Sequence, residues 1–504
     1  KILHTNGNEI TSSAELDSVL EIIIEYNSWQ ESITIEKSKY FVSNEEELAD
    51  VLQEIYNNLL ENKPITAIDS FEINNEQVLK DIEFRINENI TLTVNAKIDL
   101  QGNSKVIGTN KETSIIRRGD SYKGTVIGGG TAKSINLSNL TLQGNGAWTG
   151  EADEILNRGT TYTKELANDA ILSTGYGSTS CNITMDNVVI RDCSTSTTGG
   201  NVYFGRPGTI NITNCSFIDN NSGDDNNSGS AGTIWITQFP TVTFSNCTFS
   251  GNSSFGTSYN NGGGAIRIQN GYVTIEDSTF ENNGAFNSNY GGAIYFVVGE
   301  LFIDNSEFNH NYAPVGAAIR VNEESFNISN TSFTNNISYG VGCVLSSPKP
   351  GVRYFSNCEF VNNECSASSS GGGIFWASGV TLNDCTIKSN LNRNIEHLSE
   401  ALFLPAITIE GGMQIEGNQS SDGTTTIDTN IYVGDNFKAF NISGKLTKEN
   451  SIHINVDDSI QNVVVANAVG YVLTEEDVKA FVCDNSNYEI FLNTTDNVIE
   501  IRKK

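Results

Sequence analysis

The sequence predicts an all-β protein built as a parallel β-helix, with a helix-containing cap at its N-terminal end and a small cap at its C-terminal end. One recurring phrase is an apolar residue followed three positions later by Asn, as in Phe217 and Asn220. Gly-Gly-Ala-Ile or a close variant recurs between its copies, as at 263–266 and 291–294. The apolar residues of successive copies lie 25–32 residues apart, the period of one solenoid coil with variable loops. They are Phe217, Phe249, Phe280, Phe308, Phe333, Phe360 and Ile387.

Alternation of apolar and polar residues predicts that each period consists of short strands. The segments 265–268 (AIRI), 272–277 (YVTIED) and 278–282 (STFEN) alternate in this way. Clusters of Gly, Asn and Ser between such segments predict sharp turns. Because a single coil of this kind cannot bury its own apolar face, the copies are expected to stack in register, with strands about 4.8 Å apart.

The repeated positions acquire distinct roles in such a stack. The Phe rings are expected to pile up inside the coil, each contributing on the order of 2 kcal/mol of hydrophobic free energy. The Asn three positions later is expected at a corner, where its amide can bond the Asn of the next coil. The Gly pair permits backbone conformations and close approaches that a Cβ would block.

Cysteines occupy several of the small-residue positions that lie two places before the apolar residue. Stacking places Cys215 beside Cys247 and Cys358 beside Cys385. Their expected Cα separation suits a disulfide, but the parallel directions of the side chains do not, so buried free thiols are the favoured alternative.

The alternation of Gly-Gly-Ala-Ile with Phe-x-x-Asn, over roughly 183–390, resembles the repeats of the chlamydial polymorphic outer-membrane proteins and their relatives in gut bacteria and some protists. The resemblance implies a right-handed parallel β-helix that is displayed on a surface and used for adhesion.

Residues 1–80 are predicted to form an N-terminal cap built from a duplicated helix–strand unit. A first helix is expected within 12–27, where Leu16, Leu20 and Ile23 follow helical spacing. A second is expected within 43–58, where the same pattern returns 32 residues later at Leu48 and Leu52. These helices would cover the open end of the stack, which otherwise exposes core and strand edges. A separate binding domain is the alternative.

Residues 81–455 are predicted to form the β-helix, and 456–504 the C-terminal cap, which includes a short helix from Thr474 to Phe481. Residues 146–168 interrupt the period and are predicted to be an excursion with helical content on one side of the stack. Because insertions in solenoids often carry recognition, Trp148 and Tyr162 are candidate receptor contacts; a packed cover over a side groove is the alternative.

Composition excludes several classes of partner. The chain has 504 residues with 30 basic and 60 acidic side chains, a net charge of −30, which disfavours nucleic acid and anionic lipid. Its low content of Lys and Arg also argues against uronate or sialate ligands. No apolar run is long enough to insert directly into a membrane. Nine cysteines without a Cys-x-x-Cys pattern argue against a zinc site. The start at Lys1, without Met, favours a mature chain.

Catalysis is a possible function of this fold, because parallel β-helices include pectin lyases and polygalacturonases. Such sites need clustered carboxylates with a nearby His and a basic clamp. Asp224 and Asp225 form the one tempting acidic pair, whereas the four His are scattered. A solvated turn is the favoured interpretation of the pair; it could also hold a weak Ca²⁺, although the Asp-x-Asp-x-Asp-Gly pattern is missing. No catalytic residue, cofactor or metal ligand is therefore assigned.

Two further groups of residues are candidates for binding. Arg118, Gly119 and Asp120 form an Arg-Gly-Asp string that an exposed loop could present to a receptor, while local pairing of Arg118 is the alternative. Glycan binding would use solvent-facing aromatic residues, although regularly spaced aromatic residues are more often core. The candidates that follow Gly-rich corners are Tyr203, Trp235, Tyr295 and Trp376.

Together these observations predict a non-enzymatic, surface-displayed or secreted β-helical adhesin or structural surface protein that binds a receptor or glycan on a host or neighbouring cell. A carbohydrate-active lyase or hydrolase on the same fold is the first alternative. A self-assembling subunit of an extracellular filament or coat is the second, because stacked coils can be extended end to end.

Overall fold

The fold was analysed in a computed structural model of the chain. It describes residues 69–504 apart from 87, 147, 154–157, 163–168, 197–199, 224–231, 256–261, 287–289, 323–324, 348, 350, 367–372, 394–402, 405–406 and 435–436. Before residue 69 it describes Ile2–Leu3, Val19–Tyr26 and Trp29–Lys37.

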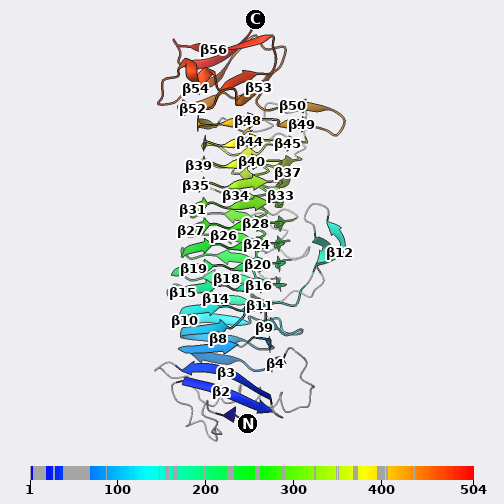
Figure 1. Cartoon of the computed structure of the whole chain (residues 1–504), viewed down its shortest axis with the longest axis vertical. Helices are drawn as coiled ribbons and strands as arrows, with labels where there is room; N and C mark the ends of the chain where they lie inside the picture. The colour runs from blue at the N-terminus through cyan, green and yellow to red at the C-terminus, as the bar shows by residue number, and fades with distance from the viewer. Residues whose placement is uncertain are drawn as a thin grey trace. The chain divides into compact units, whose positions relative to one another are not determined.

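The chain is a β-solenoid of about 12 parallel turns with 57% strand and 1% helix, which confirms the predicted parallel β-helix (Figure 1). Contacts divide it into two compact units. Unit 1 comprises 1–153, 158–256 and 270–272, and unit 2 comprises 154–157, 257–269 and 273–504. Each unit contains strands of three parallel sheets, called the first, second and third sheet below, in the order in which a coil passes through them.

The N-terminal prediction of a helix is wrong where the structure describes it. Residues 19–26 form strand β2 (Val19–Tyr26), which pairs antiparallel with β1 (Ile2–Leu3) and with β3 (Trp29–Lys37). β3 in turn pairs antiparallel with β6 (Ile82–Ile86). The run Ile22–Ile24 explains the outcome, because consecutive β-branched residues lose side-chain freedom in a helix and pack well on a pleated sheet. The second predicted helix, 43–58, lies outside the described residues.

Unit 1 builds its coils from strands of all three sheets. Its first-sheet strands are β5 (Gln77–Lys80), β6, β8 (Ile98–Gly108), β10 (Ile127–Ser138), β14 (Leu172–Tyr176), β15 (Asn182–Asp186), β18 (Val202–Gly205), β19 (Thr209–Thr213), β22 (Ile234–Ile236) and β23 (Thr241–Ser245). Its second-sheet strands are β4 (Asp69–Ile73), β7 (Ile90–Val94), β9 (Ser114–Arg118), β11 (Thr141–Gln143), β16 (Val189–Arg191), β20 (Ser216–Ile218) and β24 (Thr248–Ser250). Its third-sheet strands are β17 (Ser194–Thr195), β21 (Asn221–Ser222) and β25 (Ser253–Ser254).

Unit 2 repeats the arrangement. Its first-sheet strands are β26 (Ile266–Ile268), β27 (Gly271–Glu276, whose first two residues belong to unit 1), β30 (Ile294–Phe296), β31 (Gly299–Asp304), β34 (Ile319–Val321), β35 (Phe326–Ser329), β38 (Leu345–Ser346), β39 (Arg353–Ser356), β42 (Phe375–Trp376), β43 (Val380–Asn383), β46 (Phe403–Leu404), β47 (Thr408–Gly411), β52 (Phe440–Leu446), β54 (Asn462–Ala468), β56 (Tyr488–Asn493) and β57 (Val498–Lys503). Its second-sheet strands are β28 (Thr279–Glu281), β32 (Glu307–Asn309), β36 (Ser332–Thr334), β40 (Glu359–Val361), β44 (Thr386–Lys388), β48 (Gln414–Glu416), β51 (Tyr432–Val433), β53 (Ile452–Val456) and β55 (Phe481–Cys483). Its third-sheet strands are β29 (Gly284–Ala285), β33 (Tyr312–Val315), β37 (Ile337–Val341), β41 (Glu364–Cys365), β45 (Leu391–Asn392), β49 (Gln419–Ser421) and β50 (Thr426–Asp428).

One coil of unit 2 shows how the sequence makes the corners. The chain leaves β31, turns at Asn305 with φ of 45°, forms β32, and turns again at His310 with φ of 52°. It then forms β33 and turns at Gly316, whose φ is 64°. Asn and Asp tolerate this left-handed region better than other residues with a side chain, which accounts for their abundance at corners.

The predicted aromatic ladder is present inside each unit. Phe217 stacks on Phe249 in unit 1, with ring centroids 4.9 Å apart and an angle of 4° between the planes. In unit 2, Phe308 stacks on Phe280 at 4.6 Å and on Phe333 at 5.0 Å. Every one of these rings is fully buried, so each contributes its whole apolar area to the core.

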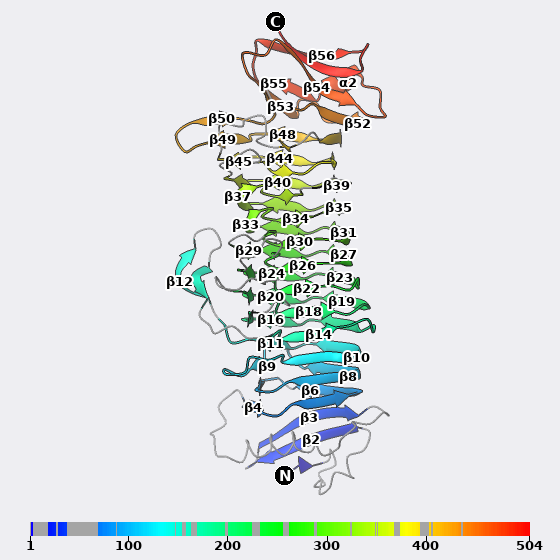
Figure 2. The same cartoon turned by 180° about the vertical axis from the view of Figure 1, so that it is seen from behind.

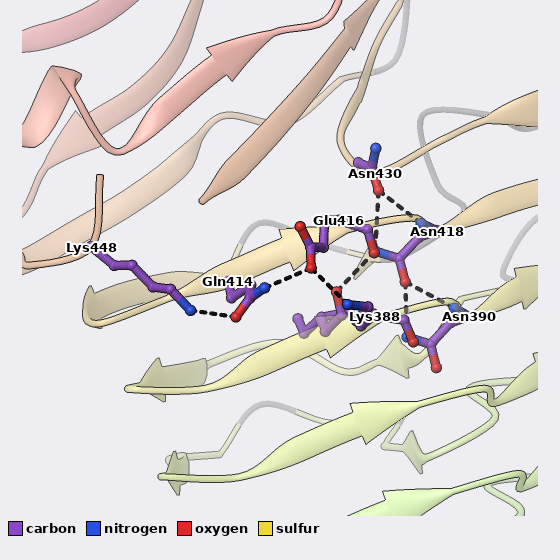
Figure 3. Close-up of polar contacts among 8 residues, drawn as sticks. Lys388, Asn390, Gln414, Glu416, Asn418, Asn430 and Lys448 are labelled. Carbon is purple, nitrogen blue, oxygen red and sulfur yellow. Dashed lines mark hydrogen bonds and ion pairs between the residues drawn. The ribbon is translucent and has the colours of Figure 1, made fainter. Parts of the chain in front are cut away.

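A second ladder of buried Asn residues runs along the neighbouring corner of unit 2. The Asn336 Nδ2 donates to Asn363 Oδ1 at 2.9 Å and to the Phe308 carbonyl at 2.9 Å. The Asn336 Oδ1 accepts hydrogen bonds from both the Nδ2 and the backbone N–H of Asn311. Figure 3 shows the same pattern for Asn390, Asn418 and Asn430, beside a chain of surface contacts that links Lys448 to Lys388. The ladder thus satisfies both ends of each buried amide.

The Gly-Gly-Ala-Ile phrase has the predicted backbone role. Gly291 lies at φ of 69°, and a Cβ there would approach the Ile294 carbonyl oxygen to 2.2 Å. The next residue, Gly292, faces the backbone of the neighbouring coil, where a Cβ would lie 2.3 Å from the Ala317 carbonyl oxygen. The first Gly therefore supplies a left-handed turn and the second a close approach between coils.

The C-terminal region contains the predicted short helix, α2 (Glu475–Val478). The Asp477 carboxylate is buried and accepts hydrogen bonds from the backbone N–H of Thr474 at 2.8 Å and of Leu446 at 2.9 Å, which fixes the start of the helix. β57 pairs antiparallel with β54 and β56. Within the described part of the chain, no helix has the length and apolar character needed to cross a membrane.

The insertion near 146–168 differs from the prediction of helical content. Its described residues form an antiparallel hairpin of β12 (Trp148–Asp153) and β13 (Arg158–Tyr162), which stands beside the coils of unit 1 (Figure 2). The sequence around the first strand alternates Thr149, Glu151 and Asp153 with smaller residues, a period of two that fits a strand better than a helix.

Substituting Phe308→Ala should lower the free energy of unfolding by about 3–5 kcal/mol, because it removes a fully buried ring that stacks on two others. Urea denaturation followed by circular dichroism measures the change. Phe302→Ala is the matched control on the same coil, since Phe302 is 47% exposed and should change stability by less than about 1 kcal/mol. Equal effects of the two substitutions would contradict the inward ladder.

Substituting Asn336→Ala should lower the free energy of unfolding by roughly 2–4 kcal/mol, because the Phe308 carbonyl and the amide of Asn311 lose buried hydrogen bonds. The same urea titration reports the loss. Asn327→Ala serves as control because Asn327 is exposed on β35. A neutral Asn336→Ala variant would mean that the amide ladder does not stabilise the stack.

Candidate functional site

The most distinctive surface feature is a row of aromatic and arginine side chains on the short first-sheet strands. Each member lies between buried residues on its strand, as Arg267 lies between Ile266 and Ile268, so its side chain points away from the interior of the coil. We call this row the aromatic–arginine ladder. Its members are Tyr203 and Trp235 in unit 1, and Arg267, Tyr295, Arg320 and Trp376 in unit 2.

In unit 1 the ladder is an aromatic pair. Tyr203 on β18 is in register with Trp235 on β22. Their ring centroids lie 5.0 Å apart with 29° between the planes, and both residues are half-buried. The sequence alone did not decide whether these two rings belong to the core or to the surface. In the structure both lie on the outside of the coil.

In unit 2 the ladder alternates between arginine and aromatic residues. Strand register places Arg267, Tyr295 and Arg320 side by side on β26, β30 and β34. The Arg267 guanidinium carbon lies 5.7 Å from the centroid of the Tyr295 ring. The Arg320 guanidinium carbon lies 4.8 Å from the ring of Tyr290 and 5.8 Å from that of Trp376. The cations are thus held by cation–π contacts.

Burial gives this part of the ladder unusual electrostatics. Burial lowers the pKa of Arg267 and that of Arg320 below the ordinary guanidinium value, while neighbouring tyrosines act in the opposite direction. Burial also raises the pKa of Tyr295, although the two arginines oppose this. Arginine remains charged despite such shifts. Tyr295 and Arg320 are buried, at 2% and 7% exposed, whereas Arg267 and Trp376 are half-buried and form the accessible part of the ladder in unit 2.

Aromatic and guanidinium side chains are types that contact sugars in general. Aromatic faces pack against the apolar faces of pyranose rings, and guanidinium groups donate to hydroxyl, carboxylate or sulfate oxygens. In unit 2 the members Arg267, Tyr295 and Arg320 lie on successive coils about 4.8 Å apart, and Trp376 follows two coils beyond Arg320. None of its members is a His, Asp, Glu or Lys side chain, the types that most often act as general acid or base.

A shallow polar groove is the second candidate surface of unit 2. Its volume is about 460 Å³, and it follows the corner between the first and second sheets. Four exposed carboxylates line it: Asp277, Glu307, Glu359 and Asp384. Glu307 and Glu359 lie two coils apart in register, about 10 Å, which is too far for both to ligate one cation at the usual 2.3–2.6 Å.

The Arg-Gly-Asp string does not present its two charges together. Arg118 is 2% exposed, and its Nη2 donates to the Asp169 carbonyl oxygen at 2.9 Å. Asp120 is exposed, and its carboxylate pairs with Arg117 at 2.8 Å. The alternation of β9, with Ser114, Ile116 and Arg118 buried, explains why the arginine points inward. Receptor binding by this string remains a prediction.

The other residues singled out from the sequence are not brought together. Trp148 and Tyr162 lie opposite each other in the β12–β13 hairpin. Asp224 and Asp225 fall outside the described residues, as do His4 and His397. His310 is exposed at a corner, and the His453 Nδ1 lies 2.8 Å from the Asp484 carboxylate. Among the described residues no group of three or more His, Cys, Asp and Glu side chains could hold a metal ion.

All nine cysteines are free thiols, and eight of them are buried. The Cys215 Sγ donates to the Thr213 carbonyl oxygen at 3.1 Å. Burial raises the pKa of Cys193 and of Cys215 to about 12, and that of Cys247 to about 11. Because the thiolate is the nucleophile, these protonated thiols are unreactive near neutral pH.

Comparison with known proteins gives little further information. No family model matches the chain, and no solved structure matches it. A stretch of 148 residues, 28% of the chain, is 29% identical to the metabotropic glutamate receptor-like protein R of Dictyostelium discoideum. This match covers 9% of that protein, so the chain spans only a small part of its length.

The sequence identified the aromatic members of the ladder but missed Arg267 and Arg320. Arg267 follows the Ile of a Gly-Gly-Ala-Ile phrase, in AIRI, and Arg320 follows the Ile of the variant Gly-Ala-Ala-Ile, in AIRV. Tyr295 takes the same place in AIYF. The position after Ala-Ile therefore points outward in each coil, and aligning the copies on that phrase would have found the arginines.

The thiols provide a test of this packing. At pH 8 an excess of a thiol-reactive disulfide reagent should label at most Cys483, which is half-buried, whereas all nine cysteines should react in denaturant. Mass spectrometry of the quenched protein counts the labels. The Cys483→Ser variant should give almost no label in the folded state. Rapid reaction of Cys215 or Cys247 under native conditions would contradict their burial.

Proposed function

We propose that the protein is a non-enzymatic, surface-displayed or secreted β-solenoid that binds a glycan of a host or neighbouring cell. The observation that carries the proposal is the aromatic–arginine ladder, because it places sugar-binding side-chain types on the outside of successive coils. Resemblance of the repeats to the chlamydial polymorphic outer-membrane proteins supports the same role.

Two further properties support binding rather than turnover. The ladder contains no carboxylate among its members, so it lacks the pair of carboxylates on which glycoside hydrolysis ordinarily depends. The net charge of −30 favours solubility outside a cell and disfavours nucleic acid. A repeated surface on a stiff stack also suits weak contacts that add up along one extended ligand.

A binding assay with product analysis tests the proposal. The 504-residue chain should bind at least one oligosaccharide on a defined glycan array and leave it intact, as judged by chromatography for new ends. Trp376→Ala should weaken that binding by about tenfold, because an aromatic face contributes on the order of 1–1.5 kcal/mol.

Phe302→Ala is the control, since it removes an exposed ring from another strand of the same unit. It should leave the dissociation constant unchanged. Cleavage of the oligosaccharide would replace the proposal with a carbohydrate-active enzyme. Absence of any glycan binding, together with filaments in electron micrographs, would replace it with a self-assembling subunit.

A further inference from the structure

The neighbours of the Arg320 guanidinium do not satisfy all of its hydrogen-bond donors. Arg320 is 7% exposed although its side chain points away from the interior of the coil. Its Nη1 donates to the Ser346 hydroxyl, and the rings of Tyr290 and Trp376 lie against it. Its Nε is buried without a hydrogen-bond partner, and no described carboxylate forms an ion pair with it.

This arrangement is energetically incomplete. Removing a guanidinium from water without a counter-ion is costly in free energy, and cation–π contacts recover only part of that cost. A buried donor left without an acceptor adds a further cost. The chain carries 60 acidic side chains, yet none of the described ones is used here. An oxyanion supplied from outside would complete the site.

The surroundings favour a sugar as the carrier of that oxyanion. Ser346 separates Arg320 from Trp376 in the strand register, and its small side chain lets the Trp376 ring approach the guanidinium. Arg267 lies two coils from Arg320, about 10 Å, with Tyr295 between them. Cationic and aromatic groups thus alternate along the stack, as an extended chain of charged pyranose rings would require.

We propose that Arg320 binds the carboxylate or sulfate of an acidic glycan whose sugar ring packs against Trp376. This rests on the proposed glycan-binding function and names the class of ligand. It reverses the expectation from composition that the low content of Lys and Arg argues against uronate or sialate ligands. The chain as a whole is poor in Lys and Arg, but Arg267 and Arg320 lie only two coils apart on the ladder of unit 2.

Calorimetric titration with three oligosaccharides of equal length tests the proposal: one carboxylated, one sulfated and one neutral. The wild-type chain should prefer at least one acidic probe over the neutral one by about 10- to 100-fold, the range expected for a charge-assisted hydrogen bond. The two acidic probes distinguish a carboxylate from a sulfate. Arg320→Gln should abolish the preference while leaving the neutral probe within about twofold of wild type.

Two controls separate binding from folding. Arg393→Gln removes an exposed arginine that pairs with Glu364 at 2.8 Å, and it should leave every affinity unchanged. Arg320→Lys keeps the charge but loses the planar fork, so it should bind the acidic probe with intermediate affinity. If Arg320→Gln does not fold, the weaker acidic-probe binding of Arg320→Lys and competition by inorganic sulfate on the wild-type chain decide the question.

The outcomes separate the two proposals. Equal affinity for acidic and neutral probes, or an unchanged preference in Arg320→Gln, would overturn the role of Arg320 and leave glycan binding intact. Failure of all three oligosaccharides to bind would overturn both. Equally tight binding of poly-glutamate, blocked by Arg320→Gln, would assign the site to an acidic peptide and overturn the glycan.

Discussion

The buried asparagine ladder is the constraint on which the rest of the structure depends. Each corner amide must place two donors and one acceptor where water cannot reach, and in unit 2 the stack of coils in one register pairs them with neighbouring coils. The Asn311 and Asn336 amides therefore hold successive coils in register, while the Phe rings fill the interior of the coils. Hydrogen bonding sets the geometry, and burial supplies most of the free energy.

A fixed inner register leaves the outer face free to vary. The side chain after Ala-Ile projects outward in each coil, and it can be Arg267, Tyr295 or Arg320 without disturbing the buried residues on either side. Coils differ in length because the loops between their strands differ in length, so the strands themselves still stack. Binding properties in such a protein therefore depend on which residues occupy one repeated position, and the fold itself places few limits on them.

The sequence predicted the interior well because the interior repeats. The Phe and Asn positions and the left-handed glycines were all derived from two phrases, and the structure places them as expected.

Features that occur once were harder to predict. The segment around Ile22–Ile24 has helical spacing but β-branched residues, and pairing with two other strands decided the outcome. Arg118 looked like a loop residue in its three-residue string, whereas its strand alternation turns it inward. Arg267 and Arg320 were missed because the candidates for surface binding were aromatic residues alone, although the two arginines occupy the same position of the repeat.

The acidic charge of the chain and a site for anions are compatible when distances are considered. At physiological salt the Debye length is about 8 Å, so exposed carboxylates more than about two coils from a ligand are largely screened from it. The Arg320 guanidinium is partly buried between aromatic rings, where screening by salt is weaker and each hydrogen bond is stronger. Long-range repulsion by the net charge of −30 slows the approach of any polyanion. A ligand of the proposed class would therefore carry negative charges spaced widely enough to meet the arginines one at a time.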